Sequence, residues 1–352
     1  MGAERTVMAT TLADIAQQAG VSVATVSKVL NGRPGVSESK RAEVLRFMKN
    51  SGYSGRSGQS KKPSRLVDFV MRGIDTLWAT QLLIGAETEA AHAGVGLVIS
   101  ATHGRMIGNR HWVDRIAERQ PDGIVVVASR IHAGIEAELS RLRIPYVLLD
   151  MVGTPPPGVA VIGATNAAGG RTAVDHLVEL GHRKIAIITG NRELACSQER
   201  LDGYLASLVR VGIIPRNDYI AYGNFEITGG YRGACTMLDL PDPPTAIFAG
   251  SDLQAYGVYQ AARERGVRIP EDLSVIGFDD VPMCEWLVPK LTTIRQPLEE
   301  MARQGVRMVL AMAYQDAKPS PTKVELATTL VVRGSTAPPR IPELAPLGTR
   351  VY

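Results

Sequence analysis

The stretch TTLADIAQQAGVSVATVSKVLN, residues 10–31, determines the architecture of the N-terminal part of the chain. Thr11 is placed to cap a helix whose apolar residues recur every three or four positions, and Asp14 completes a capping box. Gly20 can adopt the positive φ that ends such a helix, and Ser22 can cap a second helix directly afterwards. Two helices joined this closely must cross at a steep angle, which predicts a helix-turn-helix.

The second helix of this stretch has two distinct faces. At about 100° per residue, Val26, Val29 and Leu30 lie on one side with Val23 at its edge. The opposite face is small, hydrogen-bonding and singly positive, and it consists of Ala24, Ser27, Lys28 and Asn31. Such a face can enter a DNA major groove. For a lone amphipathic helix, the alternative interpretation is that this face is simply exposed to solvent on a small helical unit.

A third helix is predicted to begin at Ser37. Val44, Leu45 and Met48 are expected to point inward from it, and Gly52 ends it. Residues 1–53 are therefore predicted to form a three-helix unit.

The charge of the 352 residues is divided unequally along the chain. Residues 1–65 hold eleven Lys and Arg against four Asp and Glu, a net charge of +7. The remaining residues hold 28 Lys and Arg against 31 Asp and Glu, a net charge of −3. A short basic segment joined to a mildly acidic body is typical of a polyanion-binding module attached to another domain.

Several classes of protein are disfavoured by what the sequence lacks. Three widely spaced cysteines without a CxxC pair fit a reducing cytoplasm. No apolar run approaches the ~18 residues of a membrane span, so we expect a cytoplasmic protein without a membrane partner. The sequence shows no glycine-rich phosphate loop, no metal-ligand spacing of histidines and no nucleophile–base motif. We therefore expect no cofactor, no metal and no enzymatic activity.

The pattern changes at Leu66, where short β-branched runs begin to alternate with longer helical stretches. Continuous apolar runs of this kind predict parallel strands that are buried on both faces. The runs span residues 66–71, 96–101, 123–129, 145–150, 184–190, 246–252 and 274–280. Ligands bind at the carboxyl ends of the strands in such folds. The predicted fold class is an α-helical head followed by an α/β body.

Residues 10–31, with VSESKRAEVLRFMKNSGY at 36–53, resemble the DNA-binding head of the lactose-repressor (LacI/GalR) family of bacterial transcription regulators. The resemblance continues in LGHRKIAIITG (180–190), RLDGY (200–204), IPEDLSVIGFDD (269–280) and LTTIRQP (291–297). It implies a helix-turn-helix head over residues 1–53 and a two-lobed periplasmic-binding-protein-like body over 66–334. Lobe one is expected at about 66–162 plus 296–324, lobe two at about 163–294 plus 325–334, and a Pro-rich tail at 335–352.

The resemblance also assigns DNA-contacting residues in the head. It implies that Val23, Ala24 and Lys28 read bases, although a phosphate contact by Lys28 is nearly as well supported. Phosphate contacts are implied mostly for Thr11, Ser22, Thr25, Ser27 and Asn31.

The segment SGRSGQSKKPSR, residues 54–65, departs from the family pattern, which has a Pro, an Asn and a leucine that wedges into the minor groove. Gly55 and Gly58 each oppose a helix by roughly 1 kcal/mol. We favour a flexible basic linker in which Arg56, Lys61 and Lys62 contact phosphates, over a degenerate hinge helix that forms on the operator. The favoured interpretation predicts that this protein kinks its operator less than its relatives do.

A ligand site is implied in the cleft between the lobes. Arg200, Asp279 and Asp150 match polar ligand contacts of the family, and Phe225 and Ser251 are weaker matches. Trp78, expected on the loop after the first strand, can stack on a sugar ring. A forked cation, two carboxylates and aromatic walls suit a neutral polyol. Asp252 is expected to cap the following helix, and Cys196 to be a buried spectator.

The expected function is sequence-specific transcriptional regulation. The favoured form is a repressor of a carbohydrate-utilisation operon that a mono- or oligosaccharide releases from DNA. The alternative is a co-repressed or dual regulator that responds to a purine or another small metabolite. A homodimer is expected on a pseudo-palindromic double-stranded DNA operator, because one head alone binds a half-site weakly. The tail has no leucine heptads, so a coiled-coil tetramer is not expected.

Overall fold

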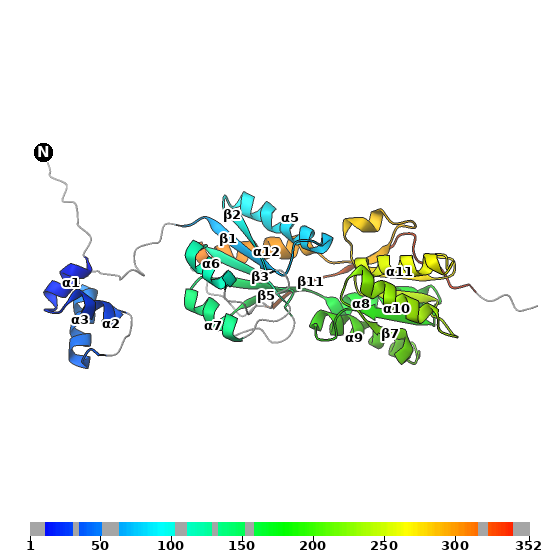
Figure 1. Cartoon of the computed structure of the whole chain (residues 1–352), viewed down its shortest axis with the longest axis horizontal. Helices are drawn as coiled ribbons and strands as arrows, with labels where there is room; N and C mark the ends of the chain where they lie inside the picture. The colour runs from blue at the N-terminus through cyan, green and yellow to red at the C-terminus, as the bar shows by residue number, and fades with distance from the viewer. Residues whose placement is uncertain are drawn as a thin grey trace, which may run out of the picture. The chain divides into compact units, whose positions relative to one another are not determined.

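The computed structural model of the chain describes residues 11–30, 35–50, 63–102, 111–128, 133–151, 158–315 and 323–340. Described residues up to Pro63 form one compact unit, and those from Ser64 onward form another (Figure 1). No helix among the described residues has the length and apolar character needed to cross a membrane.

The first unit contains three helices, α1 (Leu12–Gln18), α2 (Val23–Leu30) and α3 (Glu38–Asn50). The predicted capping box is present at the start of α1. The backbone N–H of Thr11 donates to the Asp14 carboxylate at 2.7 Å, and the N–H of Asp14 donates to the Thr11 hydroxyl at 3.3 Å. Gly20 follows α1 with a φ of 57°, and the N–H of Thr25 donates to the Ser22 hydroxyl at 3.1 Å. Both predicted boundaries of the turn are confirmed.

The core of the first unit corrects one expectation for α3. Val44 and Met48 are buried as predicted, but Leu45 is half exposed. Phe47 instead packs against the core. Positions 44, 47 and 48 lie on one helical stripe, whereas Leu45 is turned about 100° away from Val44.

The second unit is built on two six-stranded sheets, one in each lobe (Figure 1). The sheet of lobe one is parallel throughout, in the order β11-β5-β4-β3-β1-β2. Its strands are β1 (Leu66–Met71), β2 (Gly96–Ala101), β3 (Gly123–Val127), β4 (Tyr146–Leu149), β5 (Ala160–Ala164) and β11 (Lys323–Leu326). Its helices are α5 (Leu77–His92), α6 (His111–Arg119), α7 (Ala133–Leu142) and α12 (Leu298–Tyr314). The pair α5 and α12 covers one face of this sheet, and α6 and α7 cover the other.

The sheet of lobe two has the order β12-β10-β9-β8-β6-β7, and its edge strand β12 runs antiparallel to β10. Its strands are β6 (Ile185–Thr189), β7 (Ile220–Tyr222), β8 (Ala246–Ala249), β9 (Ser274–Asp279), β10 (Thr292–Arg295) and β12 (Thr329–Val331). Its helices are α8 (Asn166–Glu179), α9 (Ala195–Arg210), α10 (Ile227–Leu238) and α11 (Asp252–Glu264). The pair α8 and α9 covers one face, and α10 and α11 cover the other.

The chain passes between the lobes three times, after β5, after β10 and after β11. Two of these passes are joined, because the N–H of Thr328 donates to the Thr165 hydroxyl at 3.0 Å. Strands β5 and β11 end at Ala164 and Leu326, each two residues beyond the limits expected for lobe one.

Both ends of the second unit extend beyond their expected limits. Ser64 and Arg65, expected in the linker, bind the side chain of Asp122 in lobe one. Ser335, expected in the tail, is fully buried and donates its hydroxyl to the carbonyl of Val275 at 2.6 Å. Its neighbours are anchored as well, so residues 335–340 are a part of lobe two.

Candidate functional site

The exposed face of α2 is the candidate DNA contact of the first unit. Val23 is 47% exposed, Ala24 and Lys28 are exposed, and Ser27 is partly buried. The start of a helix carries a partial positive charge that attracts phosphate oxygens. With Lys28 on the same face, α2 offers a small, positively charged surface that fits a major groove.

Three other predicted DNA contacts have structural tasks in the helix caps. The hydroxyls of Ser22 and Thr25 lie 2.9 Å apart at the start of α2, and Thr11 belongs to the capping box of α1. The remaining predicted contacts, Asn31, Arg56, Lys61 and Lys62, lie outside the described residues. Their roles, and the absence of a hinge helix, stay predictions.

Arg200 is the centre of a buried polar cluster in the second unit. It lies on α9 and is only 4% exposed. Its Nε donates to the side-chain oxygen of Asn166 at 2.9 Å, and its Nη1 donates to the carbonyl of Gly250. The guanidinium carbon lies 3.7 Å from the ring centre of Phe278 and 5.2 Å from that of Phe225. These partners fix the plane of the guanidinium before any ligand arrives.

Two predicted carboxylates interact electrostatically with this arginine. Asp279 ends β9, and its Oδ1 lies 3.9 Å from Nη1 of Arg200. Asp150 follows β4 in the other lobe. Burial raises the pKa of Asp279 well above its ordinary value and that of Asp150 to about 6, while the charge of Arg200 opposes both shifts. The structure therefore brings Arg200, Asp279 and Asp150 into one electrostatic cluster.

The backbone at this cluster is unusual. Asp150, Phe225 and Asp279 have φ values of 59°, 64° and 118°, which side-chain-bearing residues rarely adopt. Such conformations persist where the surrounding structure holds them, and they are frequent at ligand sites. All three residues follow or end a strand, where the fold class places its ligands.

Ser251 and Asp252 support the cluster rather than lining it. The Ser251 hydroxyl accepts from the N–H of Gln254 at 3.2 Å and donates to the carbonyl of Phe225 at 3.0 Å. Ser251 is thus the cap of α11, which corrects the expectation that Asp252 is the cap. Asp252 is fully buried and accepts from the N–H of Val281 at 2.9 Å.

Trp78 differs from its expected placement. It is the second residue of α5 rather than part of a loop, and it packs partly buried against the lobe-one core. Its stacking on a ligand stays a prediction.

Sequence reasoning missed three members of the cluster. Asn166 follows β5, which was not recognised as a strand, and Phe278 was assigned only to a strand interior. Gln296 donates its Nε2 to the Asp279 carboxylate at 2.6 Å. It was visible in the LTTIRQP motif, but the motif alone did not indicate its partner.

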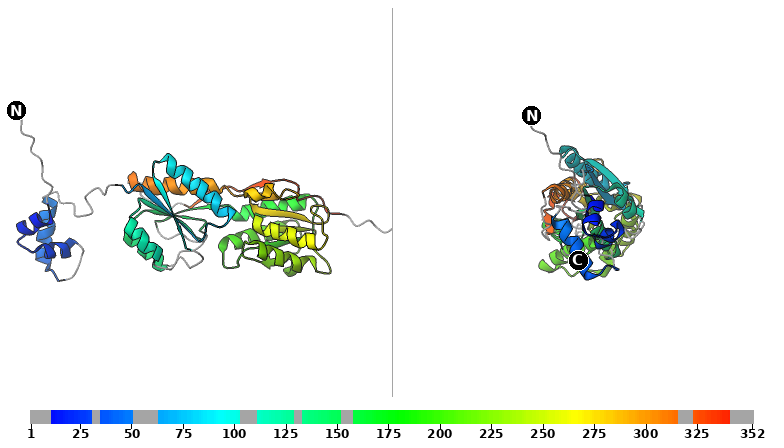
Figure 2. Two further views of the ribbon diagram at one scale, coloured as in Figure 1. Left: turned by 45° about the horizontal axis from the view of Figure 1, so that its top comes forward. Right: turned by 90° about the vertical axis from the view of Figure 1, so that its left-hand side faces the viewer.

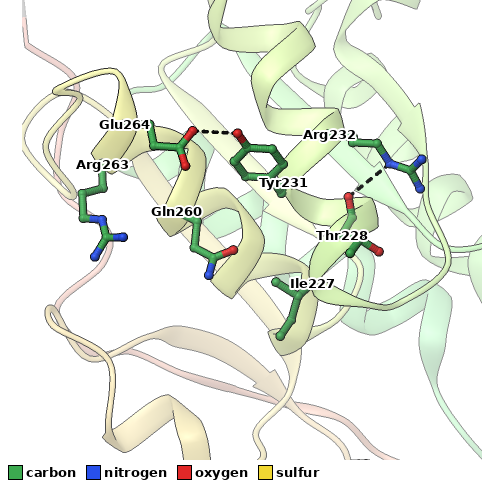
Figure 3. Close-up of a pocket in the computed structure, with 7 residues that line it drawn as sticks. All are labelled: Ile227, Thr228, Tyr231, Arg232, Gln260, Arg263 and Glu264. Carbon is green, nitrogen blue, oxygen red and sulfur yellow. Dashed lines mark hydrogen bonds between the residues drawn. The ribbon is translucent and has the colours of Figure 1, made fainter.

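A separate hollow lies on the surface of lobe two, between α10 and α11 (Figure 3). It has a volume of about 620 Å³. The Tyr231 hydroxyl donates to the Glu264 carboxylate at 2.6 Å there, and Arg232 and Arg263 also line it. None of the predicted ligand residues lines this hollow. Within the described part of the chain, no three side chains are grouped as metal ligands.

Two family models match the chain. Residues 11–55 match the model described as bacterial regulatory proteins, lacI family, and residues 174–336 match a periplasmic binding protein-like domain. The chain is 32% identical over 340 residues to the HTH-type transcriptional repressor CytR of Escherichia coli, covering 96% of this chain and 99% of the relative.

Solved structures show the same similarity. A complex of the transcriptional regulator CelR with cellobiose is 29% identical with a TM-score of 0.72, over 93% of this chain and 99% of the other. The lac repressor dimer bound to operator and the anti-inducer ONPF is 26% identical with a TM-score of 0.70, over 94% and 100%.

Proposed function

Because the chain belongs to the lacI family of bacterial regulatory proteins, we propose that it is a transcriptional repressor released from its operator by a small sugar. The sugar binds at the cluster of Arg200, Asp279 and Asp150, and the α2 face binds the DNA. The family consists of DNA-binding regulators, and the proposal assigns no chemical reaction to the chain. It acts in the cytoplasm, where the chromosome is.

The orientation of Arg200 is the observation that carries the choice of a sugar. Its guanidinium lies over the ring of Phe278, near the ring of Phe225 and beside the Asp279 carboxylate. A fixed guanidinium next to a carboxylate offers paired donors and acceptors, which vicinal hydroxyl groups can satisfy. The ring of Phe225 is partly exposed and is an apolar surface suited to the C–H face of a sugar ring, whereas Phe278 is fully buried and supports the guanidinium from within the core.

Release by the sugar follows from the position of the cluster. Asp150 belongs to lobe one, whereas Arg200 and Asp279 belong to lobe two. A ligand that contacts all three stabilises one arrangement of the lobes over another, which is a population shift. A coupling free energy of about 1–3 kcal/mol between effector and DNA is typical of such control.

DNA recognition requires two copies of the chain in this proposal. One α2 face covers only a few base pairs, so a homodimer binds a pseudo-palindromic operator whose half-sites match its two-fold symmetry. The similarity to the lac repressor dimer bound to operator supports this arrangement.

The test is an operator gel shift with purified full-length protein and a DNA site obtained by in vitro selection. Cellobiose and ribose are titrated, with adenine and hypoxanthine as the purine arm. We expect a sugar to weaken operator binding. A purine that strengthens binding would instead establish the co-repressed alternative.

Arg200→Lys tests the role of this arginine, because lysine keeps the positive charge but lacks the planar, forked guanidinium. We expect it to bind operator normally and to lose the sugar response. Arg210→Lys is the control, since Arg210 lies on the same helix but is exposed and pairs with Asp175 at 2.8 Å, outside the cluster. A full sugar response in Arg200→Lys would contradict the role assigned to this arginine.

A further inference from the structure

We propose that helix α12 connects the effector cluster to the point where the DNA-binding linker enters the second unit, and that Asp122 is the positioning residue at that entry. The inference rests on the proposed function, because it explains how sugar binding at the cluster affects the linker that leads to the DNA-binding head. Figure 2 shows α12, in orange, running beside α5 along lobe one.

The first end of α12 is attached to the effector cluster. Gln296 lies two residues before the helix, which begins at Leu298. The N–H of Gln296 donates to the carbonyl of Asp279 at 3.1 Å, and its side chain donates to the Asp279 carboxylate at 2.6 Å. Asp279 is the carboxylate that faces Arg200. A change in what Asp279 binds therefore acts directly on the segment that starts α12.

The second end of α12 is attached to the linker entry through Asp122. Tyr314 is the last residue of the helix, and its hydroxyl donates to Oδ2 of Asp122 at 2.7 Å. The same carboxylate accepts from the N–H groups of Ser64 and Arg65 at 2.9 and 2.8 Å, and from the Ser64 hydroxyl at 3.1 Å. These are the first two residues of the second unit. One carboxylate thus joins the end of α12 to the chain that leads to the head.

The linker entry is held in a conformation that it would not adopt freely. Arg65 has a φ of 54°, a left-handed value that is unfavourable for arginine. Its N–H donates to Asp122, and its carbonyl accepts from the N–H of Gly96 at 2.7 Å. Although burial opposes it, the hydrogen bonds from Tyr314, Ser64 and Arg65 lower the pKa of Asp122 below its ordinary value. The carboxylate is therefore ionised at neutral pH and binds all of its donors.

Between its two ends, α12 packs tightly against α5 and β3, so we expect the helix to move as one rigid body. A Cβ atom added at Gly85 would lie 2.1 Å from the carbonyl of Glu299, so α5 and α12 touch backbone to backbone. A Cβ at Gly123 would lie 2.7 Å from Val309, so the helix also presses on β3. Arg307 bridges to Glu89 of α5 at 2.8 Å. Close-packed interiors transmit displacement rather than absorb it.

The test is a double-mutant cycle on operator affinity, measured with full-length, sugar-free protein by fluorescence anisotropy on the selected operator. Gln296→Ala removes the contact at the cluster, and Tyr314→Phe removes only the hydroxyl that reaches Asp122. The helix has 17 residues, so its ends lie about 25 Å apart, a distance at which unconnected sites contribute independently.

We expect the double variant to differ at least threefold from the product of the two single effects. Tyr259→Phe is the matched control, because its hydroxyl donates to the Pro289 carbonyl in lobe two, away from α12. Its effect should combine with Gln296→Ala as a simple product. Asp122→Asn in place of Tyr314→Phe should reproduce the coupling. Thermal unfolding confirms that each variant is folded.

Independent effects of Gln296→Ala and Tyr314→Phe in folded variants, or unchanged operator affinity in both, would overturn the connection through α12. Failure of cellobiose and ribose to change operator binding by the wild-type chain is a different result. It would contradict the proposed effector class, while the sugar-free cycle still decides whether α12 couples the two places.

Discussion

At the scale of single residues, the cluster around Arg200 shows how a fold can hold charged groups ready for a ligand. Burial makes ionisation of Asp150 and Asp279 unfavourable, and the positive charge of Arg200 offsets that cost only in part. Hydroxyl groups of a ligand can supply the hydrogen bonds that these carboxylates lose on leaving water. The cluster therefore gains most from a ligand that is rich in donors.

The raised pKa of Asp150 leads to a pH-dependent sugar affinity. Burial raises this pKa to about 6 against the charge of Arg200, so the carboxyl is protonated at pH 5 and ionised at pH 7. The ionised form accepts two hydroxyl donors, so we expect sugar affinity to rise over this interval, by at most about tenfold per pH unit. Isothermal titration at pH 5, 6 and 7 measures the rise. Asp150→Asn should flatten it, and an unchanged slope in that variant would exclude Asp150 as its source.

Lys28 can be assigned to a base or to a phosphate by one experiment. If Lys28 contacts a phosphate, Lys28→Ala should weaken binding to all sequences alike and lower the magnitude of the salt slope by about one. If it reads a guanine, the variant should lose about 1–3 kcal/mol of discrimination at one base position. Binding to a library of single-base operator variants at several salt concentrations separates the two outcomes. No change in either property would remove Lys28 from the interface.

The sequence could identify the charged members of the cluster but not their supports. Strand ends and a family resemblance both mark Asp150 and Asp279, whereas the resemblance alone marks Arg200, which lies within α9. The role of Ser251 could not be decided, since a serine after a strand can cap a helix as readily as it can face a ligand. The role of Phe278 beside Arg200 could not be predicted, because an aromatic residue in an apolar run normally indicates a core position.

At the scale of elements, strands with a clearly bounded apolar run were predictable, whether central like β1 or at an edge like β2, whereas β5, β10 and the short or polar strands were not. β1 and β2 were predicted at the residues observed, because their apolar runs are bounded clearly. β7 and β12 have three residues each, and β11 is polar at alternate positions. Their pairing comes from neighbours distant in sequence, which a local pattern does not contain.

The contact between α10 and α11 depends on glycine in a way that can be measured. A Cβ at Gly230 would lie 2.1 Å from the carbonyl of Gln254, so one of the helices must move. We expect Gly230→Ala to lower the free energy of unfolding by about 2 kcal/mol, despite the roughly 1 kcal/mol by which alanine favours a helix. Urea unfolding of the full chain measures the loss.

Gly163→Ala provides the control for this prediction. No atom lies within 4 Å of a Cβ placed at Gly163 in β5, so this substitution needs no rearrangement. We expect its effect to stay within about 0.5 kcal/mol. Equal losses for Gly163→Ala and Gly230→Ala would show that the close helix contact is not the cause.

At the scale of the whole molecule, the division of charge predicts two different responses to salt. The first 65 residues carry +7, and DNA binding by such a surface releases counterions. We expect operator affinity to fall about a thousandfold or more between 50 and 200 mM salt. Sugar affinity should change little, because Arg200 and Asp279 are buried and weakly screened. Fluorescence anisotropy measures operator affinity and calorimetry measures sugar affinity on the same preparation. An equal dependence of the two affinities on salt would contradict this division of roles.

The three passes between the lobes have a consequence for the exchange of genetic material. Each sheet takes five strands from one part of the chain and its sixth from the end, because β11 pairs with β5 and β12 pairs with β10. No continuous stretch of the gene therefore encodes a complete lobe. A recombination event that replaces one lobe leaves at least one sheet with a strand from the wrong parent. New effector specificities in this architecture should arise by point substitution at strand ends, or by transfer of the entire segment from Ser64 to Arg340.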